Sequence, residues 1–343
     1  MRQELQETMI ETDICIVGAG PVGIFAVFEA GLLGMRCHLV DVLPQPGGQL
    51  TEIYPKKPIY DIPGYPEILA GDLVREQLKQ IEPFKPTWSL GQKAVKMEKL
   101  GDAEFLTITS EGNEIKSKVI VIAGGLGVFE PRKPPIENID NFEGKGIEYM
   151  VKDPDVFKNK KLVLAGGGDS ALDWTVYLSE LASELTLVHR TKRFRGAPDS
   201  VEKVFKLADA GKINLHLDSN VTELKGNGRL DHVVITNKEG WPEHVEVDYF
   251  IPLFGLKPEL GPLADWGLEI EDNAIKVNNA LDYQTNIPGV YAIGDINTYP
   301  GKLKLILCGY HEAALMAQSA WKRINPDKKF NLKYTTVNGV NGF

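Results

Sequence analysis

The feature that most limits how this chain can fold is a glycine-rich turn placed between an apolar strand and a helix. Residues 13–17 form a short apolar run that stops at the turn GAGPVG, residues 18–23. A helix-like stretch follows, and a second apolar run begins at Cys37 and ends at Asp41. Strand, glycine turn, helix, strand and terminal acid form one βαβ unit, in the order typical of dinucleotide-binding domains.

The same order of elements returns in the second half of the chain. Residues 161–165 have the pattern of a strand that runs into GGGDSA, residues 166–171, then a helix-like stretch and a strand over 185–190. A whole βαβ unit repeated at domain-sized spacing indicates two nucleotide-binding domains rather than a solenoid. The length of 343 residues agrees with two domains. We therefore expect an α/β fold with two Rossmann-like, three-layer dinucleotide-binding domains.

Each glycine of the first turn has a separate physical role. Gly18 permits a tight turn, Gly20 removes a side chain from the path of a pyrophosphate, and Gly23 lets helix and strand pack closely. Unpaired N–H groups and the positive dipole end at the helix N-terminus attract the pyrophosphate. Asp41 can accept hydrogen bonds from an adenosine ribose. A structural turn in another α/β fold is the alternative, and the second copy of the motif disfavours it.

The second turn differs in the charge that follows it. Its three small positions are Gly166, Gly168 and Ala171, but its second strand ends at His189 and Arg190 instead of an acid. The other basic residues nearby are Lys192, Arg193 and Arg195. Guanidinium groups bind a ribose 2′-phosphate, which a carboxylate would repel. A solvated basic loop is the alternative.

This difference in charge predicts FAD at the first site and NADPH at the second. A later pair, Gly294-Asp295, follows an apolar strand and precedes a helix-like segment. A carboxylate at that strand end can bind the ribityl chain of a flavin, which supports FAD at the first site.

Composition and charge exclude several other classes of function. The net charge of −9 disfavours nucleic-acid binding, which needs a basic face. No apolar run approaches the roughly 20 residues that span a bilayer, and the N-terminus lacks the apolar core of a secretory signal. We therefore expect a cytoplasmic protein with no membrane contact. Cys15, Cys37 and Cys308 form no C-x-x-C pair, which argues against a disulfide scaffold and a metal site.

Six motifs in sequence order resemble those of the ferredoxin–NADP⁺ reductases of the thioredoxin-reductase-like type. They are GAGPVG, VLPQPGGQL, IYPKKPIYDIPGYP, GGGDSALDW, HRTKRFRG and YAIGDI, and they extend over essentially the whole chain. Thioredoxin reductases carry a redox-active C-x-x-C where this chain has Tyr149 to Lys152, so disulfide reduction by the usual relay is excluded. The Baeyer–Villiger monooxygenase signature also fails, because Glu148 and Lys152 occupy its positions.

The resemblance implies an arrangement of domains and a set of cofactor contacts. It places FAD in a discontinuous domain over 8–127 and 254–343, and NADPH in an inserted domain over 128–253. The FAD contacts that it implies are Gly18, Gly20, Val22, Gly23, Asp41, Gln49, Tyr54, Ala94, Phe129, Asp295 and Thr336. The NADP contacts are Gly166, Gly168, Asp169, Ser170, Ala171, His189, Arg190 and Arg195. Tyr54 is expected to stack on the isoalloxazine ring, and a ring from the C-terminal segment, with Phe343 as one candidate, would cover the other face.

The reaction implied is hydride transfer between NADPH and FAD, coupled to one-electron transfer with ferredoxin. The protein needs only to position the two cofactors and to provide a suitable electrostatic environment, so we expect no general acid, general base or metal ion. Four lysines are expected to be exposed near the flavin and to dock ferredoxin: Lys56, Lys57, Lys302 and Lys304. The resemblance also implies a homodimer. The alternatives are an NADPH-dependent reductase of flavodoxin, quinone or free flavin, and an FAD redox sensor without turnover.

Overall fold

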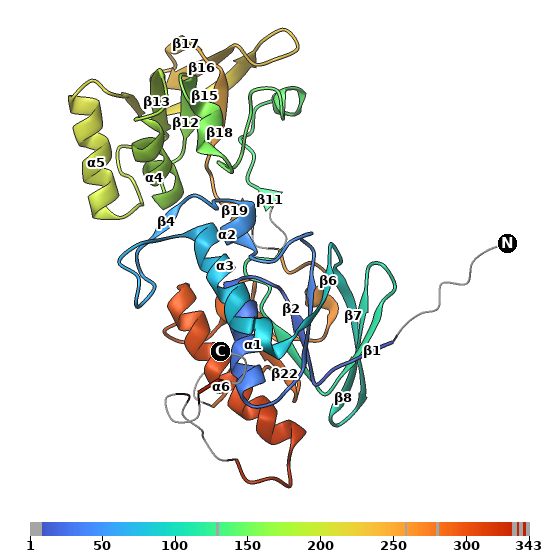
Figure 1. Ribbon diagram of the computed structural model, residues 1–343. Helices are drawn as coiled ribbons and strands as arrows, with labels where there is room; N and C mark the ends of the chain where they lie inside the picture. Colours follow the sequence, from blue (N-terminus) through green and yellow to red (C-terminus); the bar gives the residue numbers. More distant parts are fainter. Residues whose placement is uncertain are drawn as a thin grey trace, which may run out of the picture. The chain divides into compact units, whose positions relative to one another are not determined.

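The computed structural model divides the chain into two compact units, which are described here separately (Figure 1). The structure describes residues 9–127, 130–257, 259–278, 281–330, 335 and 339–340. The first unit combines Met1–Val128 with Pro258–Phe343, and the second unit is Phe129–Lys257. The second unit extends four residues past the expected boundary at 253. Its two ends are joined there, because β11 (Glu130–Pro131) pairs antiparallel with β19 (Leu256–Lys257).

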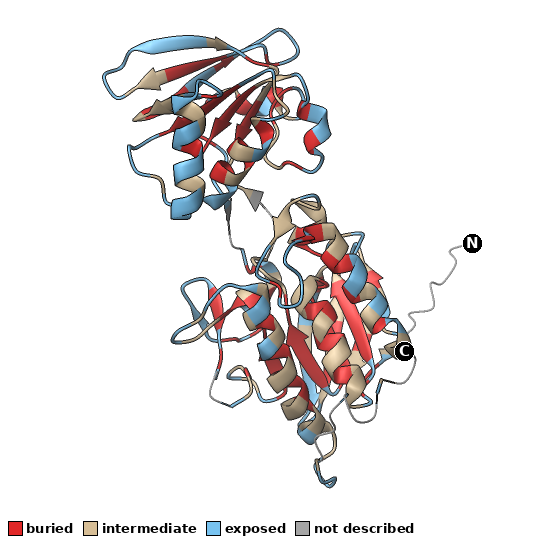
Figure 2. Ribbon diagram, turned by 60° about the vertical axis from the view of Figure 1, so that its left-hand side comes forward, coloured by how far each residue is buried: buried red, intermediate tan, exposed pale blue. Residues whose placement is uncertain are grey.

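A five-stranded parallel sheet forms the centre of the first unit. Its order is β22-β10-β2-β3-β6, and every pair in it is parallel. The strands are β2 (Ile14–Val17), β3 (Cys37–Asp41), β6 (Thr87–Leu90), β10 (Val119–Ile122) and β22 (Val290–Ala292). Strands β2, β10 and β22 are buried along their whole length, as expected for a parallel sheet covered on both faces; buried residues are red in Figure 2.

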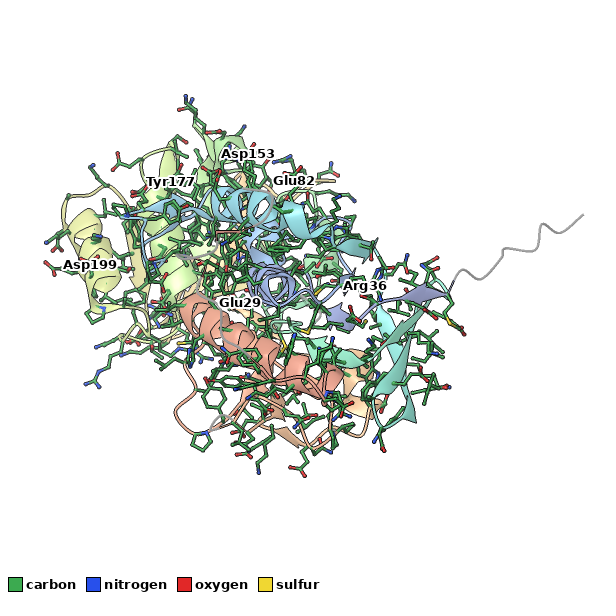
Figure 3. The ribbon with its side chains drawn as sticks, turned by 60° about the horizontal axis from the view of Figure 1, so that its bottom comes forward. Glu29, Arg36, Glu82, Asp153, Tyr177 and Asp199 are labelled. Atoms are coloured by element: carbon green, nitrogen blue, oxygen red, sulfur yellow. The ribbon has the colours of Figure 1, made fainter. Side chains whose placement is uncertain are left out.

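Helices cover one face of this sheet and a second sheet covers the other (Figure 1). Helix α1 (Pro21–Leu32) lies between α3 (Ala70–Ile81) and α6 (Ile306–Ile324), which Figure 3 shows with α1 almost end-on. The second sheet has the order β1-β9-β8-β7. Its strands are β1 (Ile10–Glu11), β7 (Ala94–Gly101), β8 (Glu104–Thr109) and β9 (Glu114–Ser117). Helices, parallel sheet and second sheet make three layers.

Short elements of the first unit lie in its connections. They are α2 (Gln49–Glu52), β4 (Pro58–Ile59), β5 (Ile68–Leu69), η1 (Glu82–Phe84), η4 (Gly261–Asp265), β20 (Ile270–Glu271), β21 (Ala274–Lys276), η5 (Gly294–Ile296) and β23 (Asn297–Thr298). Two of them, α2 and η5, follow glycine turns that matter for the site.

The second unit repeats the plan with a smaller parallel sheet. The sheet has the order β14-β13-β12-β18, with β12 (Lys161–Ala165), β13 (Glu184–His189), β14 (Asn214–Leu217) and β18 (Tyr249–Pro252). Helices α4 (Asp169–Leu178) and α5 (Pro198–Asp209) pack together. An antiparallel sheet of β15 (Ser219–Lys225), β16 (His232–Asn237) and β17 (Pro242–Glu246) shares a core with β12, β13 and β18. Two 3-10 turns, η2 (Ile139–Phe142) and η3 (Pro154–Phe157), precede β12. The predicted α/β class with two Rossmann-like units is confirmed.

Candidate functional site: two glycine turns at helix N-termini

The first glycine turn joins β2 to α1 through two contacts that only glycine allows. Gly18 has a φ of +112°, and a methyl group there would lie 2.3 Å from the carbonyl oxygen of Ala123. A methyl group at Gly23 would lie 2.1 Å from the carbonyl oxygen of Gly18. Helix α1 can therefore start directly above the carboxyl end of β2, where the sequence placed it.

Gly20 differs from its neighbours, because the space beside it is open. A methyl group at Gly20 would meet no atom within 4 Å. Gly20 is also the N-cap of α1, with an ordinary extended backbone (φ −72°, ψ 179°) and no side-chain cap. The absence of a side chain here leaves room next to the N-terminus of α1, as a pyrophosphate requires.

Asp41 holds the first turn in place. Its carboxylate, at the end of β3, accepts hydrogen bonds from the Ala19 N–H at 2.5 Å and from the Leu43 N–H at 2.8 Å. Burial raises the pKa of the Asp41 carboxyl, and the two N–H donors oppose that rise. Sequence reasoning gave Asp41 a role toward a ribose but missed this role in fixing the turn.

The loop before α2 approaches the same turn. The Gly47 N–H donates to the carbonyl of Ala19 at 2.7 Å, and a methyl group at Gly48 would lie 3.1 Å from the Cα of Gly20. Gln49, the first residue of α2, follows directly, and its amide nitrogen would lie 3.7 Å from a methyl group at Gly125. Gln49 thus stands between the turns that follow β2 and β10.

Val22 links the first turn to Gly294 and to helix α6. Methyl groups at Gly294 and Gly309 would lie 3.4 Å and 2.4 Å from the Val22 side chain, so Gly309 leaves no room for a side chain, and Gly294 is in contact with Val22 and has a φ of +78° that favours glycine. Asp295 therefore lies close to the N-terminus of α1. Burial raises the pKa of Asp295, and burial with the charge of Asp295 raises the pKa of Tyr54 to about 12. The structure brings Val22, Tyr54 and Asp295 together.

The remaining FAD contacts implied by the resemblance divide into two groups. Ala94 is buried at the start of β7, and the segment before it is held near Asp41, because the Gln92 N–H donates to the Asp41 carbonyl at 2.9 Å. Phe129, Thr336 and Phe343 lie outside the described residues.

Glu312 on α6 is a buried charge that the sequence analysis missed. It is fully buried and accepts hydrogen bonds from the Gly294 N–H (2.7 Å), the Asn297 amide (2.8 Å) and the Tyr299 hydroxyl (2.9 Å). Its fourth donor is the Lys302 ammonium at 2.5 Å. The Lys302 side chain is only 7% exposed, so the expectation that Lys302 is an exposed docking lysine was wrong. A glutamate among the buried positions 309, 313 and 316 of α6 was the available signal.

The second glycine turn repeats the geometry of the first. Gly166 has a φ of +157°, and a methyl group there would lie 2.7 Å from both the Ala171 Cβ and the Leu253 carbonyl oxygen. Gly168, the N-cap of α4, has no side-chain cap and no atom within 4 Å of an added methyl group. Gly168 therefore corresponds to Gly20, with open space next to the N-terminus of a helix.

The basic loop after β13 is tied to this turn by specific hydrogen bonds. The Arg195 N–H donates to the Gly167 carbonyl at 2.7 Å, and the Ala197 N–H donates to the Asp169 carboxylate at 2.7 Å. His189 is buried, lies 3.1 Å from the Arg193 carbonyl, and stacks on Phe194 with a centroid distance of 4.9 Å. Burial, together with the charges of Arg190 and Arg195, lowers the pKa of the His189 imidazole.

Four cations remain exposed on this loop. They are Arg190, Lys192, Arg193 and Arg195. None of them forms an ion pair within the described ranges. Ser170 is exposed in the first turn of α4. Unpaired guanidinium groups beside an open helix N-terminus form a site for a multiply charged anion, on a chain whose net charge is −9.

No dithiol accompanies these two sites. Cys15 and Cys37 are buried, Cys308 is half-buried, and all three are free. Burial raises the pKa of the Cys15 thiol to about 12. At the position where thioredoxin reductases carry a C-x-x-C, the Tyr149 hydroxyl donates to the Glu143 carboxylate at 2.7 Å. The described residues include no cluster of metal-ligating side chains and no helix long and apolar enough to cross a membrane.

Known proteins with similar sequences and structures are also nucleotide-dependent oxidoreductases. The family model "Pyridine nucleotide-disulphide oxidoreductase" matches residues 12–317. The chain is 63% identical to ferredoxin–NADP reductase 1 of Christiangramia forsetii, covering 98% of this chain and 96% of that one. It is 61% identical to a ferredoxin–NADP reductase of Flavobacterium johnsoniae, covering 98% and 95%. The crystal structure of Lactococcus lactis thioredoxin reductase is similar, with a TM-score of 0.79, 27% identity and coverage of 92% and 99%. This chain therefore belongs to the pyridine nucleotide-disulphide oxidoreductase family, and within it to the ferredoxin–NADP reductases of the thioredoxin-reductase-like type.

Proposed function

We propose that the protein is an FAD-dependent ferredoxin–NADP reductase. The observation that carries this proposal is the pair of open glycine turns with opposite charges beside them. Asp41 and Asp295 accompany the first turn, whereas Arg190 and Arg195 accompany the second. A carboxylate accepts ribose hydroxyls, and guanidinium groups bind a 2′-phosphate. The 61–63% identity to ferredoxin–NADP reductases supports the same activity.

In this proposal the first unit holds FAD. The open space at Gly20 admits the pyrophosphate, Asp41 binds the adenosine ribose, and Asp295 binds the ribityl chain. Gln49 offers its amide to the polar edge of the flavin, and the Tyr54 ring stacks against it. Their grouping around the N-terminus of α1 supports these roles.

The second unit holds NADPH, with the pyrophosphate at Gly168 and Ser170. Arg190 and Arg195 bind the 2′-phosphate, while His189 and Asp169 shape the basic loop through the contacts given above. Bound FAD would supply the chemistry that links a two-electron hydride transfer to one-electron steps. The protein then needs only to position the two cofactors and to provide charged side chains that bind them, and no side chain acts as a general acid or base.

Anaerobic titration of the purified protein with NADPH tests the proposal. We expect a yellow protein whose flavin absorbance bleaches with NADPH, and reduction of cytochrome c that depends on added ferredoxin. A colourless protein, or a flavin that NADPH cannot bleach, contradicts the cofactor assignment. Efficient bleaching without electron transfer to ferredoxin contradicts the acceptor, and assays with flavodoxin, quinone and free flavin then identify another. The resemblance also supports a homodimer, which light scattering on the eluting protein tests.

A further inference from the structure

A short segment before α6 exposes apolar side chains that nothing in the fold requires. Leu303 is 58% exposed and Leu305 is 41% exposed, and Leu307, in the first turn of α6, is 43% exposed. Lys304 between them is also exposed. Scattered surface leucines are ordinary, but three exposed leucines within five residues are a local concentration of apolar side chains, and such concentrations often mark an interaction site. We call residues 303–307 the leucine–lysine segment.

This segment is anchored firmly at both ends. On one side, the buried ion pair of Lys302 with Glu312 and the hydrogen bond from the Lys302 N–H to the Tyr299 carbonyl at 3.1 Å fix the chain. On the other side, the Gly309 N–H donates to the Leu305 carbonyl at 3.1 Å, which starts helix α6. A surface held in this way loses little conformational freedom when a partner binds.

The segment lies next to the candidate flavin site. Glu312 accepts hydrogen bonds from both the Gly294 N–H at 2.7 Å and the Lys302 ammonium at 2.5 Å, which places the start of the segment beside Asp295. Burial raises the pKa of the Asp295 carboxyl, and the charges of Lys302 and Lys304 oppose that rise. Asp295 in turn influences the pKa of Tyr54, whose ring lies 5.7 Å from the Lys57 ammonium. Leu303 and Leu305 therefore flank a lysine whose charge acts on a residue of the proposed FAD site.

The charge of the segment is opposite to that of the whole chain. Lys304 forms no ion pair within the part of the chain that the structure describes, although the net charge is −9. An apolar centre with an unpaired cation suits a partner with an apolar spot and acidic residues around it. A second copy of this chain, which is equally acidic, lacks that complementarity. A single cation also gives little attraction to anionic lipid.

We propose that the leucine–lysine segment is the docking surface for an acidic ferredoxin. The proposal rests on the proposed function and adds the place where the protein partner binds. Leu303 and Leu305 supply the apolar centre of the contact, and Lys304 supplies charge attraction and orientation. Small, transient contacts are typical of electron-transfer complexes, and a patch of this size fits that class.

The test compares two variants with two matched controls. The variants are Leu303→Ser/Leu305→Ser and Lys304→Glu. The controls are Leu281→Ser, at a leucine 72% exposed, and Lys329→Glu, at another exposed lysine of the first unit. Each protein is assayed twice: NADPH-dependent reduction of ferricyanide, which needs no docking, and reduction of cytochrome c through a purified acidic ferredoxin.

Both variants are expected to raise the KM for ferredoxin by about fivefold or more, as for interface residues whose truncation costs over about 1 kcal/mol. Lys304→Glu is expected to weaken the salt dependence of the ferredoxin reaction as well. Ferricyanide reduction is expected to stay within twofold of the unmodified protein, which also shows that the variants are folded and hold FAD.

Three results overturn the docking surface. One is an unchanged KM for ferredoxin in both variants, and another is an equal rise in the two controls. The third is a change of oligomeric state in Leu303→Ser/Leu305→Ser, because the leucines would then belong to an interface between copies. If the unmodified protein reduces ferricyanide but not ferredoxin, ferredoxin is not the acceptor and the proposed function itself is wrong. This result differs from the three above, so failure of the proposed function can be distinguished from failure of the docking surface.

Discussion

Replacing Gly20 with alanine separates the folding role of the first glycine turn from its binding role. The added methyl group meets no atom within 4 Å, and the backbone at Gly20 (φ −72°, ψ 179°) suits any residue. The FAD-free protein should therefore keep its stability within about 1 kcal/mol, because the gain of about 0.4–1 kcal/mol from the lost freedom of the unfolded chain opposes the poorer fit of alanine at the N-cap of α1. Gly23→Ala is the contrasting variant, because its methyl group would lie 2.1 Å from the Gly18 carbonyl oxygen. Such overpacking costs typically about 1–3 kcal/mol.

Binding should respond in the opposite way. The methyl group at position 20 occupies the path assigned to the pyrophosphate. Loss of even one charge-assisted hydrogen bond costs roughly 1.5–3 kcal/mol, so FAD should bind at least about tenfold more weakly. Gly168→Ala is the matched control, since it has the same open geometry and should raise the KM for NADPH while FAD content stays normal.

Urea unfolding of the FAD-free proteins measures the first effect, and fluorescence titration with FAD measures the second. The flavin-free form must be used for stability, because bound FAD itself stabilises the folded state. Full FAD affinity in Gly20→Ala would refute the pyrophosphate path. A loss of apoprotein stability as large as in Gly23→Ala would refute the assignment of open space.

Three other predictions concern charge. Arg190→Ala should raise the KM for NADPH at least about tenfold more than the KM for NADH, because a charge-assisted bond to the 2′-phosphate is lost. Steady-state kinetics with both nucleotides measures the two KM values, and equal increases contradict the 2′-phosphate assignment. His38 is buried between Thr87 and Ser89, and burial lowers its pKa to about 4. The unfolded chain therefore binds the proton first as pH falls below about 6.5, so the free energy of unfolding should drop by about 2 kcal/mol between pH 7 and 5. Urea unfolding should show that His38→Gln removes this part of the pH dependence. The same dependence of stability on pH in the variant and the unmodified protein contradicts the role of His38. Glu312→Gln should lower the free energy of unfolding by about 3–5 kcal/mol because it leaves the Lys302 charge buried and unpaired. In the same urea unfolding measurement, Glu312→Gln/Lys302→Met should recover much of this loss. No recovery would mean that the broken ion pair is not the cause of the loss.

The parts of the site that sequence could predict depend on local backbone geometry. The contact of Gly23 with the Gly18 carbonyl and that of Gly166 with Ala171 lie within one strand–turn–helix unit, so the spacing of the motif already contains them. The contacts of Gly18 with Ala123 and of Gly166 with Leu253 come from the ends of neighbouring strands and could not be read from the motif alone. The strand–helix–strand order of each unit was predicted for the same reason.

The parts that sequence missed depend on contacts between distant segments. The role of Asp41 in fixing the turn depends on Ala19, 22 residues earlier in the chain. The burial of Lys302 depends on Glu312, ten residues later on α6, so sequence reasoning took this lysine as exposed. The pairing of β11 with β19 was also not predicted, because the two strands are too short to give a sequence pattern.

That pairing also has a consequence for how the chain can be divided. The Arg132 N–H donates to the Gly255 carbonyl at 3.0 Å, so the segments that enter and leave the second unit run side by side. A compact domain whose ends are adjacent can be excised without breaking its own core, and domain insertion succeeds at such sites. Residues 129–257 should therefore be expressible as an independent nucleotide-binding module, and a short linker in their place should leave the first unit able to close on itself.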